Sequence, residues 1–223
     1  MTFGTIPPDS SGEQDFYRRI APIYDLLVGP FLRPVRNSVR RIAGESGCRR
    51  ILDIGCGTGE QANMLASDGF IAAGIDLSPA MLSKAVTGDQ RAGFFLGDAE
   101  KLPFLSGSFD CILLSLVVHE MNYSTAVGVV NDALRVLAPW GKLIIYDYRR
   151  GVGLKSRLSL ALLHIVERIA GKRHFMNFRY FIKLGGLDAF VAEFPLTVIS
   201  SRTFLLGGTK IVVAEKQFHS EMR

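Results

Sequence analysis

The stretch that decides the fold is residues 50–60, which read Arg-Ile-Leu-Asp-Ile-Gly-Cys-Gly-Thr-Gly-Glu. The apolar run at 51–54 is typical of a strand in a parallel sheet that is buried on both faces. Glycines then occupy every second position from Gly55 to Gly59, and backbone without side chains can turn sharply and touch a ligand. The stretch therefore predicts a buried strand, a glycine-rich turn beside a ligand, and the start of a helix.

Two well-known ligand-binding turns do not fit this stretch. The dinucleotide-binding fingerprint needs a third glycine at position 60, where this chain has Glu60. A P-loop needs Gly-Lys-Ser/Thr after the turn, and that sequence is missing here. What remains is an acidic residue, Asp53, inside the strand and alternating glycines after it, which indicates another kind of nucleotide-like ligand.

Further acidic residues follow two later apolar runs. The run at 70–76 ends in Asp76, and a carboxylate at this place can accept hydrogen bonds from both hydroxyl groups of a ribose. The run at 93–97 leads into Gly-Asp-Ala-Glu-Lys-Leu-Pro-Phe at 97–104. Since ligands of open parallel sheets bind at the carboxyl ends of the strands, these acids and the glycine turn predict one shared site.

The alternation of apolar runs with helical segments predicts a doubly wound, mostly parallel α/β sheet. The predicted strands of its parallel part are 51–54, 70–76, 93–97, 111–121 and 142–148. Near the end of the chain, 194–204 and 210–217 flank a Leu-Gly-Gly-Thr turn and predict an antiparallel hairpin. The expected sheet therefore has seven strands.

We expect a single domain over residues 1–223. It divides into a loose tail at 1–12, amino-terminal helices at 13–48, a cofactor-binding core at 49–148, a basic helical insert at 149–190 that is expected to act as an acceptor cap, and a hairpin at 191–223. Pro22 should kink or divide the first helical stretch, and a second helix is expected over 31–43. The arginines of this second helix are predicted to form a solvated face, made of Arg33, Arg36, Arg40 and Arg41.

Composition is that of a globular protein, with 48% hydrophobic and 21% charged residues. The three cysteines are odd in number and match no metal-ligand spacing, which predicts free thiols in a reducing cytoplasm. No apolar run reaches the roughly 20 residues that span a bilayer. We therefore expect a cytoplasmic protein, with association at a membrane surface as an open alternative. The oligomeric state does not follow from the sequence.

Taken together, the motifs resemble those of the class I S-adenosylmethionine-dependent methyltransferases over about residues 15–148. The segment Phe-Tyr-Arg-Arg-Ile-Ala-Pro-Ile-Tyr-Asp at 16–25 looks like the first helix of ubiquinone/menaquinone C-methyltransferases, and bacterial phospholipid N-methyltransferases have a similar segment. The resemblance implies a Rossmann-like methyltransferase fold with S-adenosyl-L-methionine as cofactor. It implies a cofactor site made of Tyr17, Tyr24, Asp53, Gly55, Cys56, Gly57, Thr58, Gly59, Asp76, Leu77, Met81, Asp98, Ala99, Ser115 and Leu116.

Methyl transfer from a sulfonium needs a general base only if the acceptor must lose a proton. His119, which lies near the end of the fourth predicted apolar run and precedes Glu120, is the candidate for that base. Its alternative role is to line the mouth of the cleft and bind backbone there. No metal is expected, because the four histidines show no ligand spacing. The acceptor and the atom that is methylated cannot be read from these residues.

The basic insert holds nine Arg or Lys residues between 149 and 183, against the single acid Glu167. Apolar residues recur there at helical spacing, at Leu154, Leu158, Ala161, Leu162, Ile165 and Ile169. We favour the interpretation that this stripe packs on the sheet or on the amino-terminal helices. The second interpretation is contact with an anionic membrane surface or a lipid-like acceptor, and nucleic acid is the third.

The predicted function is methyl transfer to a small apolar or amphipathic acceptor, with a quinone-like ring or a lipid headgroup as the leading classes. One rival is an NAD(P)-dependent oxidoreductase on a similar sheet, which Glu60 and the 97–104 segment disfavour. The other rival is a non-catalytic protein that binds the cofactor. Binding of S-adenosylmethionine and of NAD separates the first rival, and turnover separates the second.

Overall fold

The computed structural model describes residues 24–87, 91–169 and 171–217, without the side chains of residues 24, 25, 27 and 28. Its strands are β1 (Arg50–Ile54), β2 (Ile71–Asp76), β3 (Gly93–Leu96), β4 (Phe109–Ser115), β5 (Leu137–Tyr148), β6 (Leu196–Phe204) and β7 (Thr209–Lys216). Its helices are α2 (Tyr24–Glu45), α3 (Glu60–Ser67), α4 (Pro79–Ala85), α5 (Tyr123–Val136), α6 (Leu154–Ile169), α7 (Lys172–Leu184) and α8 (Leu187–Val191). Two short 3-10 turns are η1 (Val118–Glu120) and η2 (Leu205–Gly207).

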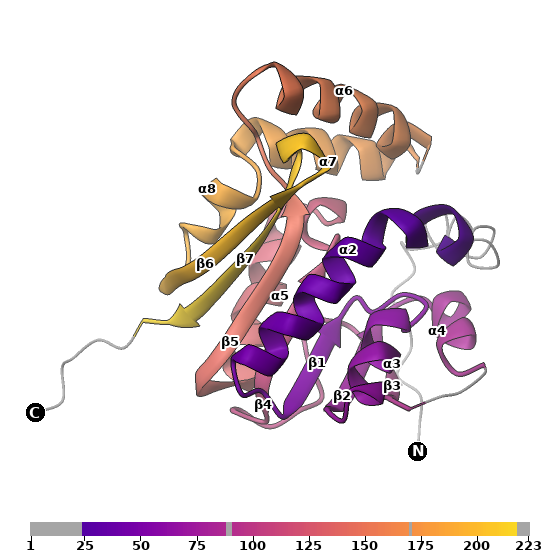
Figure 1. The fold of residues 1–223 in the computed structure, drawn as a ribbon, viewed down its shortest axis with the longest axis vertical. Coiled ribbons are helices and arrows are strands. Elements are labelled where there is room, and N and C mark those ends of the chain that lie inside the picture. The colour runs from indigo at the N-terminus through magenta and orange to yellow at the C-terminus, as the bar shows by residue number, and fades with distance from the viewer. Residues whose placement is uncertain (1–23, 88–90, 170, 218–223) are drawn as a thin grey trace, which may run out of the picture.

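The strands form one seven-stranded sheet in the order β3-β2-β1-β4-β5-β7-β6 (Figure 1). Strands β1 to β5 pair in parallel, and β7 pairs antiparallel with both β5 and β6. The predicted α/β sheet with its antiparallel C-terminal hairpin is confirmed. The chain runs from β1 outward to β3 and then returns to the other side of β1, so the strand order reverses between β1 and β4.

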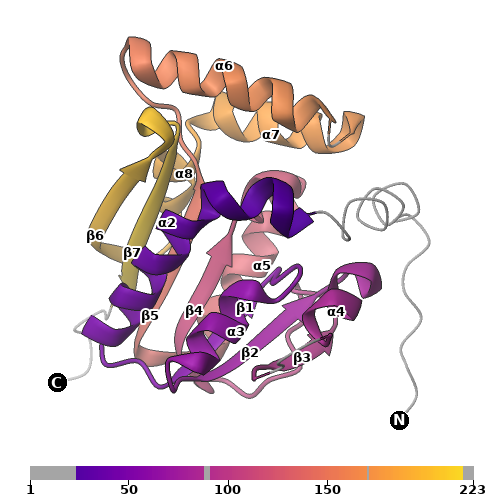
Figure 2. The ribbon, with the colours of Figure 1, turned by 45° about the vertical axis from the view of Figure 1, so that its right-hand side comes forward.

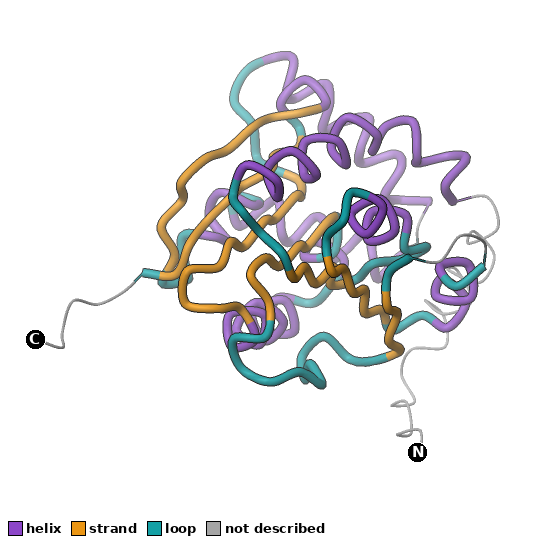
Figure 3. Tube along the Cα trace, turned by 60° about the horizontal axis from the view of Figure 1, so that its bottom comes forward, coloured by secondary structure: helices purple, strands orange, loops and turns teal. Residues whose placement is uncertain are grey.

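Helices cover both faces of the sheet (Figure 3). The alternation of side chains along each strand explains this, because Ile51 of β1 packs with α2 and α3 whereas its neighbour Leu52 packs with α5. One core cluster lies under α2 and α3, and the other lies under α5, α7 and α8. The buried parallel strands therefore read as continuous apolar runs, as expected.

The fourth strand is shorter than predicted. It ends at Ser115, because Leu116 takes a left-handed conformation with φ of 57° and breaks the extended chain. The amide of Leu116 still donates to the carbonyl of Tyr146 at 2.8 Å, and the 3-10 turn η1 follows. The predicted strand over 111–121 is therefore wrong after residue 115, and His119 lies on η1 rather than on a strand.

Helix α2 begins earlier than predicted and contains Pro30 and Pro34. The prediction of a solvated arginine face is wrong for Arg36, which is buried and forms an ion pair with Glu60 at the start of α3. Arg40 also binds α3, through Asp68. These pairs fix α2 across the glycine-rich turn. The tail at 1–12, Pro22 and most of the first helical stretch lie outside the described residues.

Helices α6 and α7 of the basic insert lie above the carboxyl ends of the central strands (Figure 1). The favoured interpretation of the apolar stripe on α6 is wrong for the described residues, because Leu154, Leu158 and Ile165 are exposed. The buried positions of α6 are Ser156, Ser159 and Glu167 instead. Among the helices of the described segments, none combines the length and hydrophobicity needed to cross a bilayer.

Candidate functional site

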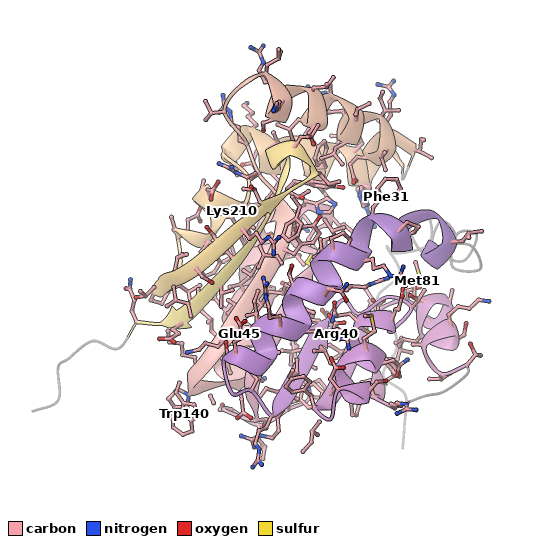
Figure 4. The ribbon with its side chains drawn as sticks, viewed as in Figure 1. Phe31, Arg40, Glu45, Met81, Trp140 and Lys210 are labelled. Atoms are coloured by element: carbon pink, nitrogen blue, oxygen red, sulfur yellow. The ribbon has the colours of Figure 1, made fainter. Side chains whose placement is uncertain are left out.

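A cleft of about 370 Å³ opens at the carboxyl ends of the central strands, within the usual size range of small-molecule sites. It lies where the strand order reverses, which is the ligand-binding place of open α/β sheets. The structure brings nine of the predicted cofactor residues to its wall: Gly55, Gly57, Asp76, Leu77, Met81, Asp98, Ala99, Ser115 and Leu116. Figure 4 shows Met81 on the first turn of α4, below the N-terminal part of α2.

The glycine-rich turn joins β1 to β2 before it starts α3. The amide of Gly55 donates to the carbonyl of Ile75 at 2.8 Å, and the amide of Gly57 donates to Oδ2 of Asp76 at 2.8 Å. Gly57 has φ of 56°, and a Cβ placed on it would meet no protein atom within 4 Å. Since Gly57 lines the cleft, this open space is room for a ligand against bare backbone.

The glycines at 57 and 59 predict different mutational effects. Gly59→Ala should destabilise the fold by about 3 kcal/mol, because its Cβ would lie 2.5 Å from the Phe94 ring and 2.7 Å from Cβ of Ala85. Gly57→Ala should cost only the left-handed backbone strain, about 1 kcal/mol, yet weaken cofactor binding at least tenfold. Thermal unfolding and calorimetric titration with S-adenosylmethionine measure the two effects.

The control for this pair is Gly47→Ala, because Gly47 also has a left-handed φ of 66° and open space but lies at the other end of β1. It should lower stability as Gly57→Ala does and leave cofactor binding unchanged. Equal losses of affinity in the Gly47 and Gly57 variants would show that strain, rather than occupied space, weakens binding.

Asp76 is the acid at the end of β2. Its Oδ1 accepts from the amide of Ser78 at 2.8 Å, and its Oδ2 accepts from Gly57. Burial raises the pKa of Asp76, and hydrogen bonds from the backbone amides of Ser78, Gly57 and Leu77 oppose that rise. Each carboxylate oxygen has a second acceptor site, so Asp76 can hold the turn and still bind a ribose diol.

Asp53 lies in the buried strand behind the turn and is not on the cleft wall. Burial raises its pKa to about 7, while Arg36 lowers it and Asp76 raises it. Its Oδ1 is buried and accepts no hydrogen bond from the described residues. A buried acceptor without a donor is costly.

Backbone geometry also marks the other walls. Oδ1 of Asp98 accepts from the amide of Glu100 at 2.9 Å, which folds the loop after β3 so that Asp98 and Ala99 line the cleft. Leu116 lines it from the end of β4 in its left-handed conformation. A strained residue without a glycine's freedom is typical of functional sites.

Some predicted cofactor residues lie off the wall. Cys56 turns toward β2, where its Sγ would be 2.7 Å from a Cβ at Gly74, and Thr58 and Gly59 are also absent from the wall. Tyr17 lies outside the described residues, and only the backbone of Tyr24 is described. For these five residues, as for the nine on the wall, a role in cofactor binding stays a prediction.

The acceptor end of the cleft comes partly from the predicted basic insert, although sequence reasoning did not single out the individual residues that line it. Helix α7 contributes Arg173, His174 and Asn177, and Nδ2 of Asn177 donates to the carbonyl of Glu120 at 2.7 Å. The remaining wall residues at this end follow β4 or lie on α5: Val117, Glu120, Met121, Asn122, Thr125 and Val129. The basic insert thus closes the cleft, as the predicted acceptor cap would.

His119 is buried behind this wall rather than on it. Its Nδ1 lies 2.7 Å from Oδ1 of Asp147, and its Nε2 lies 3.6 Å from Oε2 of Glu167. Glu167 also binds His174 and the hydroxyl of Tyr148. We call these five residues the buried polar cluster, and it connects the end of β5 with η1, α6 and α7.

Electrostatics in the buried polar cluster favour charged histidines. Burial alone would lower the pKa of His119, but Asp147 and Glu167 raise it to about 10. Glu167 raises the pKa of His174 against burial, and the two histidines hold the pKa of Glu167 below its usual range. With a carboxylate at each ring nitrogen, His119 is an imidazolium at neutral pH, so its predicted role as a base requires loss of that proton first.

A metal could find ligands here that sequence spacing did not reveal. One ligand atom each from His119, Glu120 and His174 lies within 4.8 Å of the others. However, the carboxylates of Asp147 and Glu167 already pair with the rings of His119 and His174. Protons on the two rings therefore account for the described contacts without a metal ion.

Two observations fit S-adenosylmethionine as the ligand of this cleft. Open space borders bare backbone at Gly57, and acceptor sites remain on Asp76. The resemblance implies that the turn would hold the amino-acid part of this group, Asp76 the ribose, and residues 97–99 the adenine, and all of these segments lie on the cleft wall.

Residues 52–145 match the model of a protein family described as methyltransferase domain. The chain is 32% identical over 143 residues to a demethylmenaquinone methyltransferase of Beutenbergia cavernae, covering 64% of this chain and 59% of the relative. It is 34% identical over 164 residues to the demethylmenaquinone methyltransferase of Tropheryma whipplei, covering 69% of this chain and 66% of the relative. The chain thus spans about three fifths of the length of these relatives.

Solved structures show the same fold. The plantazolicin methyltransferase BpumL, solved in complex with a triazolic desmethylPZN analog and SAH, superposes with a TM-score of 0.65 at 16% identity, covering 92% of this chain and 95% of that chain. At this identity the likeness establishes the fold alone.

Proposed function

We propose that this chain, which carries a class I S-adenosylmethionine-dependent methyltransferase domain, transfers a methyl group to a small apolar or amphipathic acceptor, with a quinone-like ring as the first candidate. The observation that carries the proposal is the cleft, where the glycine-rich turn and Asp76 meet an acceptor end closed by α7. A quinone-like acceptor is supported by the demethylmenaquinone methyltransferases among the relatives.

S-adenosylmethionine brings an activated methyl group on a sulfonium, so the protein has to position the acceptor and exclude water. Ser115 and Leu116, at the end of β4, lie between the cofactor end and the acceptor end of the wall. Val117, Met121 and Val129 provide apolar surface for a flat ring. Helix α7 closes this end and keeps water from the acceptor.

An acceptor that loses a proton needs a group on the wall to receive or orient it. Glu120 and His174 are the titratable groups that face the cleft at its acceptor end. His119 lies behind them and acts on His174 through Glu167, which makes it a positioning residue in this proposal. The leading base candidate therefore moves from His119 to Glu120.

Glu120→Gln is expected to lower kcat about a hundredfold for a hydroxylated ring acceptor and to leave the KM for S-adenosylmethionine within twofold. The physical reason is that an amide keeps the shape of Glu120 but cannot receive a proton. Transfer of a labelled methyl group to a demethylmenaquinone analogue measures both constants.

Glu193→Gln is the matched control, because Glu193 binds Tyr123 on the surface of the molecule and is not on the cleft wall. Its kinetic constants should equal those of the unchanged protein. If labelled methyl reached phospholipid or a small polar acceptor but no quinone-like ring, the proposed acceptor class would be wrong while the transferase domain stood. Tighter binding of NAD than of S-adenosylmethionine would end the methyl-transfer proposal itself.

A further inference from the structure

Helix α6 is amphipathic in the inverse sense, with its polar side chains inward and its apolar side chains outward. Oγ of Ser156 donates to the carbonyl of Gly207 at 3.1 Å, and Oγ of Ser159 donates to the carbonyl of Leu205 at 2.6 Å. These two bonds attach α6 to η2, and Glu167 attaches it to the buried polar cluster. The helix is therefore held in place by polar contacts that leave its apolar stripe outside.

We name this stripe the apolar face of α6. Its large residues are all more than half exposed, with exposed fractions of 84% for Leu154, 57% for Leu158, 57% for Leu162, 63% for Ile165, 58% for Val166 and 74% for Ile169. Contiguous apolar surface of this kind is uncommon on soluble proteins and marks a site of interaction. Figure 2 shows α6 as the outermost helix, with α7 between it and the rest of the molecule.

The exposed charges on α6 and α7 are of one sign. The exposed basic residues of these two helices are Lys155, Arg157, Arg168, Lys172, Arg173, Arg179 and Lys183. The only acid between 149 and 183 is Glu167, which is buried. The two helices therefore combine exposed apolar side chains on α6 with exposed positive charge on both, and carry no exposed carboxylate between residues 149 and 183.

We propose that the apolar face of α6, with the basic residues beside it, binds the surface of an anionic phospholipid bilayer. An interfacial helix buries its apolar side chains among the acyl chains while Lys and Arg contact the headgroups. A second copy of this chain is a poorer occupant, because two such faces would bring like charges together. The proposal does not rest on the proposed acceptor.

The position of the apolar face would bring a bound bilayer close to the acceptor end of the cleft. Helix α6 packs against α7, and α7 carries Arg173, His174 and Asn177 on the wall of the cleft. A bilayer on the outer side of α6 would thus lie one helix away from the acceptor end. An acceptor dissolved in the membrane would have a short path into the site.

Vesicle co-sedimentation with the full chain tests the proposal. The protein should sediment with vesicles of phosphatidylglycerol and phosphatidylcholine at low salt, and remain in the supernatant with phosphatidylcholine alone. Raising the salt to about 1 M should release most of it, since the Debye length falls to about 3 Å. Lys155→Gln and Arg157→Gln should each weaken binding about fivefold, the fold-change that matches about 1 kcal/mol per basic residue.

The apolar contribution is tested with Leu162→Ser/Ile165→Ser, which should weaken vesicle binding at least tenfold and leave binding of S-adenosylmethionine unchanged. The matched control is Trp140→Ser, because Trp140 is 72% exposed and lies at the opposite end of the sheet (Figure 4). It should bind vesicles as the unchanged protein does.

Depth is measured with Ile165→Trp in the Trp140→Phe background. Brominated lipids should quench the fluorescence at position 165, whereas they should not quench the native Trp140, which is the sole tryptophan of the chain. Quenching at 165 places that side chain among the acyl chains.

Three results would overturn the proposal. The first is that the unchanged protein stays in the supernatant with anionic vesicles at low salt. The second is a dimer in solution that Leu162→Ser/Ile165→Ser dissociates, which would make the face an interface between copies. The third is slow hydrogen exchange on α6 in the free protein that becomes fast when residues 1–23 are deleted, because the chain itself would then cover the face.

Discussion

Asp76→Ala should weaken binding of S-adenosylmethionine by about 4 kcal/mol, roughly a thousandfold. The carboxylate at the end of β2 can accept hydrogen bonds from both hydroxyls of a ribose, and a bond to a charged acceptor contributes about 1.5–3 kcal/mol. The same change removes the acceptor of the Gly57 and Ser78 amides, so the glycine-rich turn also loses its shape. Calorimetric titration gives the dissociation constant directly.

Asp76→Asn separates the two roles of this side chain. An amide has one oxygen, which can accept from Gly57 or from Ser78 but not from both, and it carries no charge. Affinity should therefore fall about a hundredfold, and the melting temperature should fall less than in Asp76→Ala. Asp68→Ala is the control, because Asp68 binds Arg40 on the surface and is not on the cleft wall. Unchanged affinity in Asp76→Ala would remove Asp76 from the cofactor site.

The cofactor end of the cleft could be predicted because it depends on local signals. Each parallel strand presents its carboxyl end at the same edge of the sheet, so Gly55, Asp76 and Asp98 had to meet once the strands were recognised. No long-range information was needed beyond the direction of the strands. The structure places all three on one wall.

The acceptor end could not be predicted in this way. His174 and Asn177 reach the cleft from a helix that follows the fifth strand, and nothing in their local sequence says that α7 lies over the end of β4. The end of β4 was also missed, because the left-handed Leu116 interrupts an apolar run that continues to residue 118. Hydrophobic periodicity shows how apolar and polar residues alternate, but it cannot reveal the conformation of one residue such as Leu116.

The apolar stripe of α6 shows a further limit of pattern reasoning. Helical spacing correctly grouped Leu158, Leu162 and Ile165 on one face, but it does not say which way that face points. The usual assumption is that the apolar face of a helix points to the core. Here Ser156 and Ser159 bind the backbone of η2, so the polar face points inward and the apolar face points outward. Because the apolar face of α6 is exposed, contrary to the rule that apolar faces are buried, we propose an anionic bilayer as its partner.

The other large effect is expected at Glu167. Glu167→Ala should destabilise the fold by about 3–5 kcal/mol, because it leaves His119, His174 and Tyr148 buried without the acceptor they share. The loss should appear in equilibrium unfolding by urea as a lower midpoint. Glu215→Ala is the matched control, since Glu215 forms a half-exposed pair with Lys142 and should cost less than about 1 kcal/mol.

The dependence of stability on pH gives the same prediction a second readout. The folded pKa of His119 is raised to about 10, above the ordinary value near 6.5, so its stabilisation is complete below about pH 6.5 and is lost as pH rises toward 10. The pKa of Glu167 is lowered, so its stabilisation is present above about pH 4.5 and is lost as the solution becomes acidic. The free energy of unfolding should therefore be largest between about pH 4.5 and pH 6.5 and fall on the alkaline side.

In Glu167→Ala the alkaline fall should be shallower, because Asp147 alone holds the proton on His119. An equal alkaline slope in both proteins would show that Glu167 does not stabilise the imidazolium.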